Sequence, residues 1–216
     1  MSHSRERVLA RIRTASADVP TESADIPVRR DYRAAHIPED PATMLTVLAE
    51  NLADYRAIVH YAAPKELPDL IDRLLAERGA RSLAVPADLP PEWLAAVSGV
   101  RVLTDGPALT AGRLDSVDST LTGCALAIAE TGTIVLDAGA TQGRRALTLV
   151  PDHHICVVRA DQIIASVPRA LPRLDPVRPQ TWISGPSATS DIELVRVEGV
   201  HGPRRLEVVL VCDRPG

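Results

Sequence analysis

The sequence predicts an α/β fold with an open, mixed and mainly parallel sheet, flanking helices, an added antiparallel hairpin, and a separate N-terminal helix and arm. Three observations predict this fold. Helix and strand patterns alternate over residues 43–104, which is typical of a parallel sheet with crossover helices. The stretch "GCALAIAETGTIVLDAG", residues 123–139, reads as two apolar strands joined by a turn. Residues 17–42 contain four prolines and little periodicity, so they predict an extended arm.

The elements follow one another in a regular order. In residues 1–16, apolar Val8, Leu9 and Ile12 lie on one side of an amphipathic helix. We expect this helix and the arm to occupy residues 1–42, and one compact domain to occupy residues 43–216. The first half of that domain reads as helix, strand, helix, strand, short helix and strand, at residues 43–54, 57–62, 65–78, 81–86, 91–97 and 100–103, and Gly79 is expected to end the second helix.

The second half adds the hairpin, a helix at residues 144–151, and strands at residues 153–160, 181–184 and 205–212. A two-residue loop of Thr131 and Gly132 would pair Glu130 with Thr133. Because a β-branched Thr disfavours positive φ, we expect a type II turn with Gly132 at the positive φ, or a longer loop.

Composition excludes several classes of protein. No apolar run approaches the roughly 20 residues that span a bilayer, and the N-terminal residues lack the apolar region of a secretory signal, so we expect a cytoplasmic protein. A net charge of -4, with two Trp, three Tyr and no Phe, argues against a nucleic-acid platform. The three cysteines lie far apart in strand-like runs and read as reduced core thiols. Glycine-rich nucleotide motifs are absent from the sequence, and we expect neither a cofactor nor a metal.

Candidate functional residues lie in three segments of the second half. The first is Glu130 in "ETGT", a carboxylate at a turn shaped by Gly132, whose simplest alternative is a polar hairpin end. The second pairs Arg145, which could bind a carboxylate bidentately, with His154, which could donate or accept a proton. A surface arginine and a strand-edge histidine are the alternatives here.

The third segment, residues 181–203, runs from a strand into a loop of small residues. Its hydroxyls and the backbone N–H groups after Gly185 could bind an anion. Ser190 and Glu193 fit a capping box that would open a short helix, and capping is the alternative role for both. His201 and Gly202 then place an imidazole at the joint with the last strand.

Four blocks in this order resemble the lactate-utilisation protein C family, whose unit is the LUD domain, over about residues 43–212. They are "AETGTIVL" (129–136), "RALTLVPDHHICVV" (145–158), "ISGPSATSDIE" (183–193) and "GVHGP" (199–203). The resemblance implies a fold like that of the sugar-phosphate isomerase and CoA-transferase superfamily. It also implies a non-redox component of a three-component cytoplasmic system that oxidises L-lactate to pyruvate, with iron-sulfur companion proteins.

Two other functions stay open. Glu130 stands in the Glu-x-Gly context of the CoA-transferase nucleophile, although a glycine-rich oxyanion loop and a CoA-phosphate site are not found in the sequence. A small-carboxylate binding or regulatory module is the third candidate. The N-terminal helix and arm could dock on a companion protein or on a second copy of the chain, which leaves a homodimer open.

We expect one pocket to unite these segments, because ligands of open α/β sheets bind beyond the carboxyl ends of strands. Glu130 and His201 are the expected catalytic residues, and Gly132 and Gly202 shape the turns. The expected ligand-binding residues are Arg145, His154, Ser184, Gly185, Ser187 and Thr189.

Overall fold

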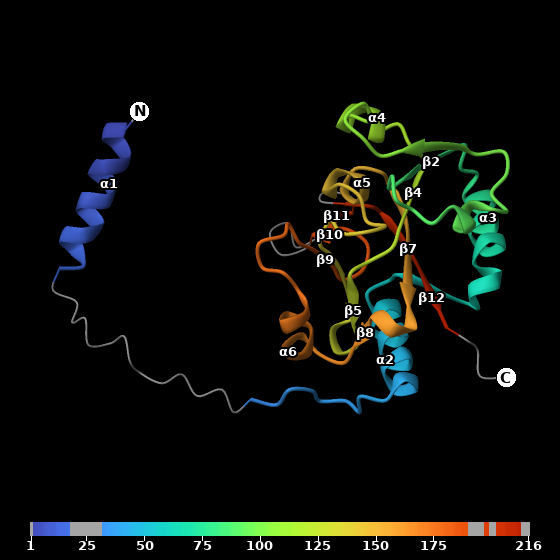
Figure 1. Ribbon diagram of the computed structural model, residues 1–216, viewed down its shortest axis with the longest axis horizontal. Coiled ribbons are helices and arrows are strands. Elements are labelled where there is room, and N and C mark those ends of the chain that lie inside the picture. The colour runs from blue at the N-terminus through green and yellow to red at the C-terminus, as the bar shows by residue number, and fades with distance from the viewer. Residues whose placement is uncertain (1, 18–31, 190–196, 199–201, 213–216) are drawn as a thin grey trace. The chain divides into compact units, whose positions relative to one another are not determined.

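The computed structural model describes residues 2–17, 32–189, 197–198 and 202–212 (Figure 1). The chain divides into two compact units, Met1–Arg33 and Ala34–Gly216. The first unit contains the predicted N-terminal helix, α1 (Ser2–Ala15), on which Val8 and Ile12 are exposed. The capping box predicted at Ser190 and Glu193 lies outside the described residues.

The second unit is built on a six-stranded sheet in which every neighbouring pair of strands is parallel. The predicted α/β class with a mainly parallel sheet is therefore confirmed. Across the sheet the strands are β1 (Ile58–Ala62), β12 (Arg205–Val211), β7 (His153–Arg159), β4 (Ser119–Thr122), β2 (Ser82–Val85) and β3 (Arg101–Thr104).

A second sheet contains the predicted hairpin. Its order is β8 (Ile163–Ile164), β5 (Leu126–Ile128), β6 (Thr133–Leu136) and β9 (Thr181–Ile183). The hairpin β5–β6 is antiparallel as predicted, and it belongs to this separate sheet rather than to the large one. Since β5 and β9 each run antiparallel to β6, both strands end at the same edge of the sheet. A short ladder pairs β10 (Ala188–Thr189) with β11 (Val197–Glu198).

The turn of the hairpin is longer than two residues. Ile128, not Glu130, pairs with Thr133, so the predicted pairing of Glu130 with Thr133 is wrong. Glu130 instead lies in a 3₁₀ turn, η4 (Ala129–Thr131), and Gly132 follows with φ of 55°, which confirms the longer loop with Gly132 at positive φ. Gly132 ends the 3₁₀ turn in the left-handed conformation, and β6 begins at the next residue.

Helices cover both faces of the large sheet (Figure 1). On one face, α3 (Leu67–Arg78) and the 3₁₀ turn η3 (Pro91–Leu94) pack on the sheet, and Gly79 ends α3 in the left-handed conformation as expected. On the other face, α2 (Pro41–Asp54) and the second sheet enclose a second large apolar cluster. The remaining helices are short: α4 (Ala111–Leu114), α5 (Arg145–Leu149) and α6 (Val167–Ala170). No helix in the described ranges is long and apolar enough to cross a bilayer.

A buried carboxylate joins four neighbouring strands of the large sheet. Glu207 of β12 is only 1% exposed, and its oxygens lie 2.7 Å from His60 Nε2 of β1 and 2.7 Å from Arg205 Nε. His153 Nε2 of β7 lies 3.2 Å from Glu207 Oε1, at ion-pair distance but without hydrogen-bond geometry. His153 Nδ1 is 2.8 Å from the hydroxyl of Ser119 on β4. Burial alone would raise the pKa of Glu207, but the neighbouring nitrogen atoms outweigh burial and hold this pKa well below its ordinary value of 4.5.

Replacing Glu207 should therefore destabilise the domain. We expect Glu207→Gln to lower the free energy of unfolding at pH 7 by about 3 kcal/mol, because a buried ion pair loses one partner. Urea denaturation of the full chain measures this, with the exposed Glu92→Gln as the matched control.

The same comparison should depend on pH in one direction. Because the folded pKa of Glu207 is depressed, the unfolded state takes up a proton first as pH falls. The difference between wild type and Glu207→Gln should be fully present at pH 6–8 and should shrink as pH falls below 4.5. A difference that stays constant down to pH 3 would mean that the charge of Glu207 contributes nothing.

Candidate functional site

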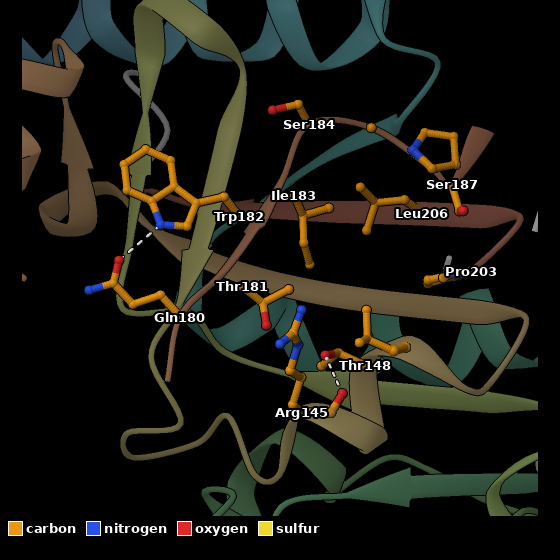
Figure 2. Close-up of a pocket in the computed structure, with 14 residues that line it drawn as sticks. Arg145, Thr148, Gln180, Thr181, Trp182, Ile183, Ser184, Ser187, Pro203 and Leu206 are labelled. Atoms are coloured by element: carbon orange, nitrogen blue, oxygen red, sulfur yellow. Dashed lines mark hydrogen bonds between the residues drawn. The ribbon is translucent and has the colours of Figure 1, made fainter. Parts of the chain in front are cut away.

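A cavity of about 620 Å³ lies between β9 with the loop that follows it and α5 with the start of β12 (Figure 2). The residues that line it are Arg145, Thr148, Leu149, Gln180, Thr181, Trp182, Ile183, Ser184, Gly185, Pro186, Ser187, Gly202, Pro203 and Leu206. Five residues predicted from the sequence are thus brought together: Arg145, Ser184, Gly185, Ser187 and Gly202.

Arg145 is the only charged residue among the described residues that line the cavity. Its neighbour Arg144 precedes α5 and is anchored by Asp105, whose carboxylate accepts hydrogen bonds from the Arg144 backbone and guanidinium. This anchor fixes the first turn of α5. Figure 2 shows the Arg145 guanidinium directed toward Thr181. It makes no hydrogen bond or ion pair with any other residue that the structure describes.

The other wall begins with alternating residues of β9. Thr181 and Ile183 lie on the side of the strand that faces Arg145 and Leu206, and Trp182 lies on the opposite side (Figure 2). The Trp182 indole N–H donates to Gln180 Oε1 at 3.0 Å. The interior therefore combines a guanidinium and a hydroxyl with an apolar surface.

The loop after β9 depends on Gly185. Its φ is 81°, and a Cβ atom at this position would lie 2.4 Å from the Tyr55 carbonyl oxygen just beyond α2. Only glycine fits such a contact. Pro186 has no N–H, and the Ser187 N–H donates to the Pro203 carbonyl at 2.8 Å. The first two residues after Gly185 therefore offer no free N–H group to an anion, which corrects that part of the sequence prediction.

Gly132 makes a similar contact with the same helix. A Cβ atom there would lie 2.9 Å from the backbone of Asn51, whose side-chain amide donates to the Ala129 carbonyl at 2.8 Å. The hydroxyl of Thr133 then lies 2.8 Å from that of Ser184. The hairpin turn and the cavity loop thus meet at one edge of the second sheet, beneath α2.

Glu130 does not line the cavity. Its carboxylate accepts a hydrogen bond from the backbone N–H of His36 and another, at 3.2 Å, from that of Ile37. The Ser166 hydroxyl also donates to the Ala34 carbonyl. These contacts fasten residues 34–40, which we call the strap, to the second sheet just before α2 begins.

His154 is also absent from the cavity lining. It is completely buried in β7, beside Leu206 of β12 in the sheet register. Its Nε2 lies 2.8 Å from the Thr122 hydroxyl, and its Nδ1 has no hydrogen-bond partner among the residues that the structure describes. Burial, followed by the neighbouring His153, lowers the pKa of His154 to about 3, so the ring is neutral at physiological pH.

Two further predicted residues fall on parts of the chain without a description. His201 lies outside the described residues, and so does the side chain of Thr189. Their expected roles remain predictions, as does the single pocket that would join Glu130 and His201.

Comparison with known proteins identifies the family. Residues 45–211 match the LUD domain family. The chain belongs to the LUD domain family. It is 51% identical over 178 residues to Lactate utilization protein C of Deinococcus radiodurans, covering 81% of this chain and 82% of that protein. The protein of the same name from an Exiguobacterium species is 30% identical, over 87% of this chain and 88% of that protein.

A solved structure agrees with this assignment. The crystal structure of a DUF162 family protein from Deinococcus radiodurans superposes with a TM-score of 0.69 at 44% identity, covering 81% of this chain and all of that one. The resemblance inferred from the four sequence blocks is confirmed.

Sequence reasoning missed several residues that line the cavity of this LUD domain. Thr181 and Ile183 carried a usable signal, because alternate residues of a strand face the same side. Thr148 and Leu206 carried none, since their place in the wall depends on how α5 and β12 pack.

Removing the Glu130 carboxylate should loosen the strap of this LUD domain. A hydrogen bond to a charged acceptor contributes about 1.5–3 kcal/mol, so we expect Glu130→Ala to speed hydrogen exchange of the His36 and Ile37 amides at least about tenfold. Glu50→Ala on the exposed side of α2 is the control and should leave both rates unchanged. Equal rates in all three proteins would show that Glu130 does not hold the strap.

Proposed function

We propose that this LUD-domain protein is a non-redox component of lactate utilisation that binds a small monocarboxylate, such as lactate or pyruvate, in the cavity beside Arg145. One observation supports a carboxylate as the class of ligand. Among the described residues, Arg145 is the single charged side chain that lines the cavity, and its guanidinium has no partner there.

The chemistry of the lining suits such a ligand. A guanidinium binds a carboxylate through two parallel hydrogen bonds, and this pairing neutralises the charge of Arg145. The Thr181 hydroxyl, toward which Arg145 points, can serve a hydroxyl or keto oxygen next to the carboxylate (Figure 2). Ile183 and Leu206 provide apolar contact for the methyl group.

The place in metabolism is supported by the relatives, which carry the name Lactate utilization protein C. We assign electron transfer to iron-sulfur companion proteins in the cytoplasm, following the family resemblance. Two of the three cysteines fit that division of labour, because Cys124 and Cys156 are enclosed in the apolar core, whereas Cys212 is only partly buried.

The position of Glu130 does not favour the transferase alternative. A nucleophilic carboxylate must be able to reach its substrate. Glu130 is held by two backbone N–H groups of the strap and does not line the cavity.

Arg145 provides the direct test. We expect Arg145→Gln to weaken lactate and pyruvate binding at least about tenfold, because a charge-assisted bidentate pair is lost. Titration of the full chain followed by nuclear magnetic resonance measures this. The exposed Arg173→Gln controls for loss of one positive charge. A strain that lacks the gene should fail to grow on lactate, and Arg173→Gln but not Arg145→Gln should restore growth.

We also propose that α1 docks on a companion protein or on a second copy of the chain. Val8 and Ile12 are 56% and 55% exposed, and a lone helix of 14 residues is marginal in water. Residues 1–42 were expected to form the helix and the arm, but the strap contacts the second sheet, so the deletion should stop at residue 33.

Deleting residues 1–33 should leave the circular dichroism and the unfolding midpoint of the domain nearly unchanged, while co-purification with tagged companions is lost. Val8→Asp with Ile12→Asp should reproduce the loss in the full chain. An insoluble truncated protein, or full co-purification of both variants, would contradict docking through α1.

A further inference from the structure

The cavity is much larger than a three-carbon acid requires. Its volume of about 620 Å³ lies in the middle of the roughly 300–1,000 Å³ range of sites that enclose drug-sized ligands. A molecule of the size of lactate would fill only the part beside Arg145. The residues that line the rest of the cavity therefore indicate the chemistry of the remainder of the ligand.

The lining changes along the cavity, and the hydroxyl of Ser187 lies beside Pro203 at the end away from Arg145 (Figure 2). Arg145 and Thr181 form the opposite, charged end. Ile183 of β9 and Leu206 of β12 come next, and their side chains approach each other from opposite walls (Figure 2). Leu206 is almost completely buried at 1% exposure, so it forms a fixed apolar floor. Pro203, also buried, extends this floor away from Arg145.

We propose that the ligand is a monocarboxylic acid with an apolar chain longer than the methyl group of lactate. Its carboxylate pairs with Arg145, and its chain lies between Ile183 and Leu206. This inference rests on the proposed function, since it uses the same cavity and the same arginine. It extends the substrate class from lactate and pyruvate to medium-chain 2-hydroxy and 2-oxo acids, which should bind more tightly.

The distribution of charge excludes dicarboxylates from that class. A second carboxylate placed beyond Arg145 would lie against Ile183 and Leu206, and no other cationic residue is among the described residues that line the cavity. An ionised group without a partner on an apolar surface is strongly unfavourable. The cavity should therefore discriminate between acids of equal length by the charge at their far end.

The test is a series of 2-hydroxy acids titrated into the full chain: lactate, 2-hydroxybutyrate, 2-hydroxyhexanoate and 2-hydroxyoctanoate. Each buried methylene contributes about 0.8 kcal/mol, so affinity should rise by up to about fourfold for each added carbon until the apolar floor is covered. Malate, which has the four carbons of 2-hydroxybutyrate but a second carboxylate, should bind at least about tenfold more weakly than 2-hydroxybutyrate.

Two variants separate this inference from the proposed function. Arg145→Gln should weaken every acid of the series by a similar factor. Ile183→Thr keeps a β-branched side chain on half-buried β9 but makes the apolar wall polar, so it should reduce the gain per added carbon. Ile183→Val, a milder change, tests the same wall if the threonine variant does not fold.

The outcomes distinguish the chain-length inference from the proposed function. If lactate binds through Arg145 but longer acids bind no more tightly, the chain-length inference is overturned and the proposed function stands. Binding of malate as tight as that of 2-hydroxybutyrate would also overturn the inference. If no acid of the series binds to the wild-type chain, the proposed function falls together with the inference.

Discussion

The buried carboxylate of Glu207 is the interaction on which the arrangement of the site depends. Glu207 and Leu206 are adjacent in β12, so their side chains point to opposite faces of the large sheet. On one face Glu207 binds groups from β1 and β7, and on the other Leu206 forms the floor of the cavity. A register slip of one residue would move the charge into the apolar cluster that contains Val208, at high cost. The electrostatic contacts on one face thereby determine what the cavity presents on the other.

The fold could be predicted where the sequence pattern is local. Alternating helical and strand periods predicted β1, β2, β3 and the helices between them, and Gly79 marked the end of α3. The strand β4, "STLT", escaped because its short polar sequence has no alternation, although it is completely buried in the sheet. The second sheet was not predicted as a separate sheet, for another reason. Its strands β8 and β9 have only two and three residues, and their pairing is decided by distant partners.

Only part of the site was predictable from the sequence. The residues that could be found are those whose role does not depend on a distant partner. Arg145 and the loop from Ser184 to Ser187 were found because their chemistry is carried by their own side chains or by a local break in a strand. The role of Glu130 was not predictable, because its partner is a backbone N–H group 94 residues away in the chain. Any residue could supply that N–H, so no sequence pattern marks it. The burial of His154 was not predictable for a related reason, since complete burial of a strand residue depends on what packs above it.

The contacts of Gly132 and Gly185 with α2 have a consequence for how the cavity can move. At both positions main chain meets the residues of α2 or its end, with no side chain between them to change rotamer or compress. That edge of the second sheet is consequently a stiff wall, and its spacing from the helix is set by backbone van der Waals radii. The opposite wall is different, because Arg145 and Leu149 of the five-residue helix α5 carry long side chains with several rotamers. If the cavity changes shape, the side chains of α5 therefore move. The edge formed by Gly132 and Gly185 keeps its position against α2.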